Sequence, residues 1–150
     1  MNNFQRDGSI SNAHVGREFE ELAKQYFLKE HGIQLIHNFK LEIGLGNNKK
    51  SHSFDLGCEK KKILVECKSH RWTSGDNVPS AKMTVWNEAM YFFYLAPENY
   101  KKIFFILRDF SIKRNETLAQ YYIRTYIHLI PNSTEIWEYD ENEEKVKVYN

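Results

Sequence analysis

Two segments near the middle of the chain alternate between apolar and polar residues and predict the strands of a β-hairpin. They cover residues 53–58 and 63–68 and are joined by the polar turn 59–62. Because successive side chains on a strand point to opposite faces, one face of this hairpin is wholly apolar and belongs in a core. The residues predicted on that face are Phe54, Leu56, Cys58, Ile63, Val65 and Cys67.

The opposite face of the same hairpin carries acidic residues. With the turn centred between Lys60 and Lys61, Asp55 lies directly opposite Glu66, and Lys68 follows Glu66 on the same face. Two carboxylates in opposed positions repel each other. A fold keeps such a pair when a cation normally lies between them, so the pattern indicates a metal site.

Hydrophobic periodicity predicts the elements around this hairpin. Helices are expected over residues 13–30, over 81–95 with Ser80 as the N-cap, and over 118–129. Strands are expected over 33–43 and 103–107, with a closing hairpin over 136–139 and 146–149. Residues 1–11 are predicted to form a flexible tail. The order of elements predicts one α/β domain over residues 1–150, with a mixed central sheet flanked by helices.

Composition narrows the class of protein but leaves its partners open. Hydrophobic residues make up 41% of the chain and aromatic residues 15%, which is typical of a globular domain. The net charge of +1 permits a nucleic-acid partner without requiring one. The two cysteines both fall on the predicted apolar face, which indicates free thiols in a reducing compartment. With neither a signal region nor a membrane-spanning stretch, the sequence predicts a cytoplasmic protein.

The constellation Asp55…Glu66-Cys67-Lys68 resembles the PD-(D/E)xK nuclease superfamily. Residues 16–23, Gly-Arg-Glu-Phe-Glu-Glu-Leu-Ala, are similar to the first helix of that superfamily, and the predicted element order is similar to its αβββαβ core. Phe54 stands where the superfamily name has Pro, and residues 87–91 have only the spacing of the RecB-type Gln-x-x-x-Tyr motif. The resemblance implies a restriction endonuclease-like fold over about residues 14–108.

The resemblance also assigns roles to the acidic residues and the lysine. It implies Asp55 and Glu66 as ligands of Mg²⁺, for which Mn²⁺ can substitute, with the backbone carbonyl of Cys67 as a third ligand. Glu20 would hold a second metal or a metal-bound water. Lys68 would orient the attacking water and neutralise charge in the transition state.

A basic and aromatic rim is expected beside these residues and would contact a nucleic-acid backbone. It comprises His70, Arg71, Trp72 and Lys82, whereas Trp86 is expected in the core because of its helical spacing. The implied function is a magnesium-dependent endodeoxyribonuclease of restriction, repair or recombination type, with DNA favoured over RNA and a homodimer plausible. The alternatives are a non-catalytic nucleic-acid-binding module that retains the fold, and a protein whose acidic pair binds a cation for stability only.

Overall fold

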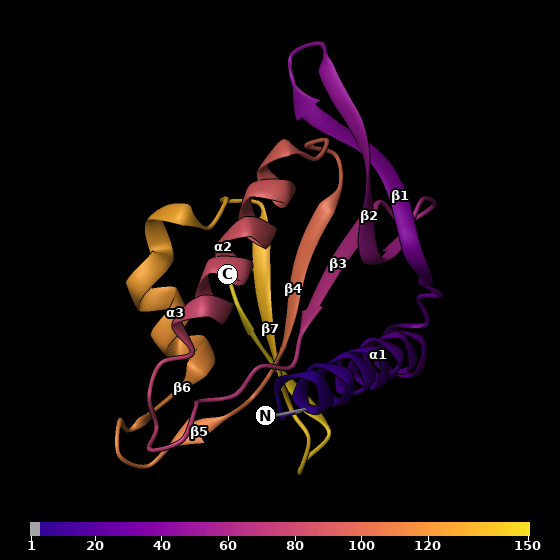
Figure 1. Ribbon diagram of the computed structural model, residues 1–150. Coiled ribbons are helices and arrows are strands. Elements are labelled where there is room, and N and C mark those ends of the chain that lie inside the picture. Colours follow the sequence, from indigo (N-terminus) through magenta and orange to yellow (C-terminus); the bar gives the residue numbers. More distant parts are fainter. Residues whose placement is uncertain (1–3) are drawn as a thin grey trace.

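A mixed six-stranded β-sheet with helices against both faces forms the centre of the molecule (Figure 1). The computed structural model describes the backbone of residues 4–150 and the side chains of residues 14–150. The sheet strands are β1 (Ile36–Leu45), β2 (Asn48–Cys58), β3 (Ile63–Lys68), β4 (Lys101–Leu107), β7 (Thr134–Asp140) and β8 (Lys145–Tyr149). They lie in the order β1-β2-β3-β4-β7-β8, in which β3, β4 and β7 are parallel and the other neighbours antiparallel. The predicted α/β class with a mixed sheet is confirmed.

One long helix covers one face of the sheet, and shorter helices cover the other. The long helix is α1 (Phe4–His31); the others are α2 (Ser80–Leu95), α3 (Leu118–Tyr126) and the 3₁₀ helix η1 (Ile127–Leu129). Between β4 and α3 the chain forms a small hairpin of β5 (Phe110–Ser111) and β6 (Glu116–Thr117), which the hydrophobic pattern did not predict. In the described residues, no helix is long and apolar enough to cross a membrane.

Strand β4 separates two hydrophobic cores because its side chains alternate between them. Phe104 and Ile106 pack with Trp86 on the α2 side, and Phe105 packs with Phe27 on the α1 side. Each of these side chains is almost completely buried, as the continuous apolar run predicts. Burying one such side chain contributes about 1.5–3 kcal/mol, so both faces of this strand hold the fold together.

The predicted hairpin forms with the predicted register, but its faces differ from the prediction at one position. Leu56 pairs with Val65 as expected, and Val65 and Cys67 lie with Leu56 in the core under α1. Phe54 was also predicted on this face, and that prediction is wrong. Phe54 lies in the other core, stacked on Phe93 of α2 with ring centroids 6.0 Å apart.

The cause is an interruption in the pairing of β1 with β2. His37 pairs with Leu56 and Phe39 with Phe54, but the intervening Asn38 and Asp55 are not paired. Asn38 has a positive φ of 53°, which breaks the regular alternation of faces. Residues on the two sides of this interruption therefore point to opposite cores.

Three helix boundaries also differ from the predictions. α1 begins at Phe4, so residues 4–11, which were predicted as a tail, are helical; residues 1–3 lie outside the described residues. Pro79, and not Ser80, is the N-cap of α2, and no side chain caps that helix. The predicted helix over 118–129 forms as α3 followed by η1, with Thr117 and Gln120 making a capping box at its start.

Candidate active site

Most of the predicted site residues line one cleft with a volume of about 690 Å³. Its walls come from the middle of α1, from the end of β3 with the loop that follows, and from the start of α2. The predicted residues that line it are Glu20, Asp55, Cys67, Lys68, His70, Arg71 and Lys82. Segments up to 62 positions apart in the sequence thus meet in one cleft, and Glu66 and Trp72 lie outside its lining.

Asp55 lies where β2 and β3 stop pairing through their backbones. The last backbone pair is Leu56 with Val65, and beyond it the backbone N–H of Cys67 donates a hydrogen bond of 2.8 Å to Asp55 Oδ2. The carboxylate thus replaces a backbone acceptor and holds the two strands in position. A carboxylate can accept this bond and still bind a cation through its second oxygen.

Glu66 is 6% exposed and faces a smaller cavity of about 190 Å³ next to the cleft. Lys68 and Val85 line both spaces. The Nζ atom of Lys68 is 3.9 Å from Glu66 Oε2, and His52 Nε2 is 3.9 Å from Glu66 Oε1. The glutamate therefore has a basic group near each of its oxygens, at a distance longer than a hydrogen bond.

Burial and like charges raise the pKa of two carboxyls at this site. For Glu20 burial is the largest cause and the charge of Asp55 the next, and together they raise the pKa to about 7 although His37 acts in the opposite direction. Burial is also the largest cause for Glu66, whose pKa it raises to about 7. His52 and Lys68 act against this rise, and the charge of Asp55 adds to it. The charge of Asp55 thus lies close enough to oppose the ionisation of both glutamates.

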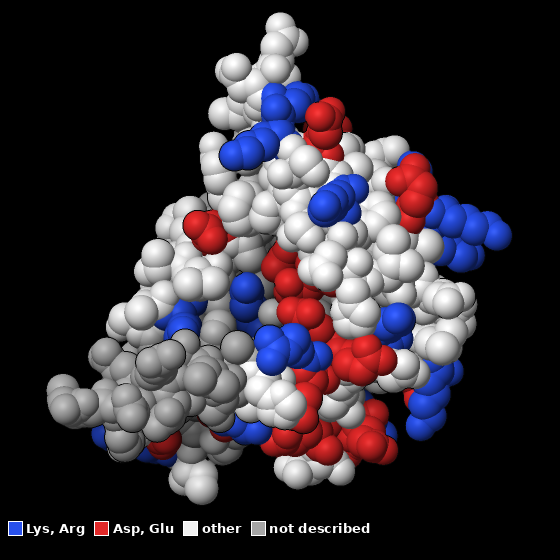
Figure 2. All heavy atoms as spheres, turned by 45° about the vertical axis from the view of Figure 1, so that its right-hand side comes forward, with Lys and Arg blue, Asp and Glu red and all other residues white. Residues whose placement is uncertain are grey.

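A divalent cation fits this donor set because it would remove that repulsion. On the face shown in Figure 2, Asp and Glu side chains (red) form a central band with Lys and Arg (blue) on both sides. Among the described side chains, no three His, Cys, Asp or Glu residues lie together as a group that could hold a metal ion. Mg²⁺ does not need one, since it keeps several waters and is commonly held by one or two carboxylates. Asp55 and Glu66 suit that mode of binding.

His70 has a defined protonation state at the cleft wall. Burial, together with the charges of Lys82 and Lys68, lowers its pKa to about 4, so the ring is neutral near pH 7. The indole N–H of Trp86 donates a hydrogen bond of 2.8 Å to His70 Nδ1. The ring proton must then be on Nε2, which makes His70 a neutral hydrogen-bond donor.

Trp72 does not line the cleft. It is 9% exposed, its backbone N–H donates to Asp109 Oδ2 at 2.8 Å, and its indole N–H donates to the backbone carbonyl of Asp109 at 3.0 Å. The Arg114 guanidinium lies 4.9 Å from the centre of the Trp72 ring. Trp72 therefore anchors the loop after β3, and its side chain is not part of the cleft wall.

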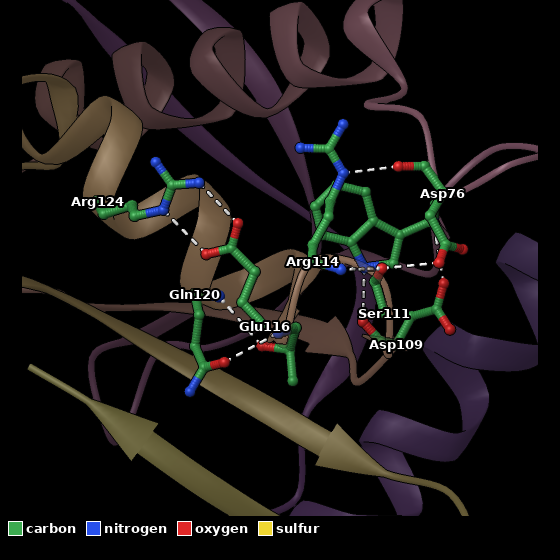
Figure 3. A network of polar contacts seen from close by, with 9 residues as sticks. Asp76, Asp109, Ser111, Arg114, Glu116, Gln120 and Arg124 are labelled. Carbon is green, nitrogen blue, oxygen red and sulfur yellow. Dashed lines mark hydrogen bonds and ion pairs between the residues drawn. The ribbon is translucent and has the colours of Figure 1, made fainter.

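The same loop is tied to the β5–β6 hairpin by the polar network in Figure 3. Asp76 accepts a hydrogen bond of 2.8 Å from the Ser111 hydroxyl, and its backbone carbonyl accepts one of 2.6 Å from Arg114 Nε. Arg71, at the cleft edge, pairs with Glu141 at 2.8 Å in the turn between β7 and β8. These contacts hold the loop that carries His70 and Arg71.

The sequence did not identify every residue of the site. Arg17 and Gly16 also line the cleft, one turn of α1 before Glu20, and the helical period could have indicated both. His37 lies near Glu20, and His52 lies beside Glu66. These two contacts depend on the pairing of β1 with β2 and on the position of α1, which no local pattern reports.

Comparisons of the chain with family models, curated proteins and solved structures found no match.

Proposed function

We propose that this protein is a metal-dependent nuclease that hydrolyses phosphodiester bonds in DNA, with a restriction endonuclease-like fold. The observation that carries the proposal is the cleft in which Glu20, Asp55 and Lys68 meet, with buried Glu66 beside it. Two glutamates whose ionisation is opposed by a neighbouring aspartate, next to a lysine, suit a divalent cation and an anionic substrate. The order of helix, three strands, helix and strand agrees with the superfamily core that the resemblance implies.

The walls of the cleft favour a phosphate backbone as the substrate. Basic side chains from three elements line it: Arg17 from α1, Lys68 from β3 and Lys82 from α2. Positive side chains of this kind bind phosphates without regard to base sequence. His70 also lines the cleft and offers an uncharged N–H donor, which suits a phosphate oxygen.

Each residue near the reacting phosphate has a distinct role in the proposed reaction. A bound divalent metal would polarise the scissile phosphate and lower the pKa of a water. Asp55 and Glu66 would hold that metal, with the Cys67 carbonyl beside them. Lys68 would orient the attacking water and stabilise the charge that develops on the phosphate oxygens. Glu20 would hold a second cation or a water that belongs to it.

Cleavage of supercoiled plasmid DNA tests this proposal. The purified protein is incubated with plasmid in Mg²⁺ or Mn²⁺, and the same reaction is run in EDTA. Nicked or linear product is expected with metal and absent with EDTA. The Lys68→Ala variant should keep its fold and bind metal but lose cleavage. Lys60→Ala, in the exposed turn between β2 and β3, is the matched control and should cleave like the unmodified protein.

The outcomes separate the nuclease from its alternatives. Equal cleavage by Lys68→Ala and the unmodified protein would remove Lys68 from the mechanism and point to a contaminating nuclease. Metal-dependent DNA binding without cleavage would favour a nucleic-acid-binding module. Sedimentation of the protein with a cleaved duplex would show whether two copies act together on the two strands.

A further inference from the structure

His52 presents a buried polar atom that the proposed chemistry does not use. Its Nε2 atom is shielded from solvent and has no hydrogen-bond partner among the described residues. The ring is held firmly, stacked on Phe92 with centroids 4.0 Å apart and edge-on to Phe54 at 4.7 Å. Leaving a buried polar atom without a partner is unfavourable, so this position needs an explanation.

The distance from His52 to Glu66 suits a shared cation better than a hydrogen bond. Nε2 and Glu66 Oε1 are 3.9 Å apart, whereas a hydrogen bond would need about 3 Å. Two ligands that each lie about 2.1 Å from one ion are separated by about 3.0–4.2 Å, depending on the angle between them. Both residues line the cavity of about 190 Å³ described above, together with Ser53 and Glu88.

We infer that His52 Nε2 and Glu66 Oε1 hold one divalent cation together, and that the imidazole gives this site a preference for Mn²⁺ over Mg²⁺. Imidazole nitrogen is a ligand for transition metals, whereas Mg²⁺ selects oxygen donors and water. The inference deepens the proposed function and rests on it for the use of the metal. The predicted carboxylates alone would leave Mg²⁺ and Mn²⁺ nearly equivalent.

Lys68 and the two phenylalanines make the site asymmetric. Lys68 Nζ lies near Oε2 of Glu66, so a cation would bind at Oε1, away from the ammonium group. Phe54 and Phe92 prevent the imidazole from turning away. A ligand held in place before the metal arrives loses little freedom on binding, which favours tight coordination.

Calorimetric titration of the full chain with MnCl₂ and with MgCl₂ tests the inference without an activity measurement. The unmodified protein should bind Mn²⁺ at least about tenfold more tightly than Mg²⁺. His52→Phe preserves the aromatic packing and should lose about tenfold or more in Mn²⁺ affinity, with its Mg²⁺ affinity changed less than about twofold. His52→Gln supplies an oxygen donor and should bind both ions with similar affinity. His128→Phe, at an exposed position in η1, is the matched control.

The titrations test the cation site and the plasmid assay tests the nuclease, so either proposal can be wrong without the other. If His52→Phe binds Mn²⁺ as tightly as the unmodified protein, or if the unmodified protein shows no preference for Mn²⁺, the inference is wrong even when plasmid is cleaved. If Mn²⁺ binding depends on His52 but no substrate is cleaved, the cation site stands and the nuclease proposal falls. Should His52→Phe unfold, the comparison of His52→Gln with the control decides.

Discussion

Replacement of Gly57 by alanine should destabilise the protein because β1 and β2 approach closely at that position. A Cβ atom on Gly57 would lie 2.4 Å from Cγ of Phe39, 2.6 Å from its Cδ1 and 2.7 Å from its Cβ. Rotating the ring cannot relieve the contact with Cβ, so the β1 backbone must move. Forcing extra volume into a packed core lowers the free energy of unfolding by about 1–3 kcal/mol.

For a chain of this length, that loss lowers the melting temperature by about 3–9 °C. Thermal unfolding followed by circular dichroism measures it. Gly16→Ala is the matched control, because a Cβ atom there meets nothing within 4 Å and the residue lies inside α1. Alanine should stabilise that helix by up to about 1 kcal/mol. The precision of such a scan is roughly 1 °C. If Gly57→Ala melts within about 1 °C of the unmodified protein, the close packing of Phe39 on β2 is refuted.

Three further changes test the site and its support. Asp109→Ala removes the side-chain acceptor of the Trp72 backbone N–H and should lower the free energy of unfolding by about 1–3 kcal/mol in a urea titration; unchanged stability would mean that the loop does not depend on this bond. In EDTA the melting temperature should fall as pH rises from about 5 to 8, because folded Glu20 and Glu66 keep protons up to a pKa of about 7 whereas the unfolded chain releases them near 4.5. Glu66→Gln should make the melting temperature depend less on pH. A melting temperature that rises with pH would contradict the raised pKa values of Glu20 and Glu66. A thiol reagent should modify partly exposed Cys58 well before Cys67, whose burial raises its pKa; equal rates, followed by mass spectrometry, would argue against the packing under α1.

The elements that the sequence predicted well are those whose pattern repeats over many residues. The apolar run of β4 and the helical spacing around Trp86 both depend on local periodicity, which packing on either side of the sheet preserves. The boundaries were weaker, because the start of α1 and the cap of α2 depend on single residues. Each strand of the β5–β6 hairpin is only two residues long, which is too short for a periodic pattern in the sequence.

The candidate site was predictable where its residues share a strand or a helix face, and not where contact crosses the fold. Asp55 and Lys68 could be related through one hairpin and its register. Trp72 was assigned to the substrate rim because the sequence cannot show that Asp109, 37 positions later, accepts both of its N–H groups. The chain between them includes all of α2 and β4, so their meeting is a property of the packed structure.

The one failed prediction inside the hairpin, the face of Phe54, lies next to Asp55, on which the proposed chemistry depends. Regular alternation would have placed Asp55 on a single face, where it could reach only one of the flanking layers. Because the pairing is interrupted at Asn38 and Asp55, the carboxylate lies where the chain changes faces. From there it acts on Glu20 of α1 and also on Glu66 of β3. Irregular backbone at a site of converging charge is what a functional constraint on the fold predicts, since packing alone would favour the regular strand.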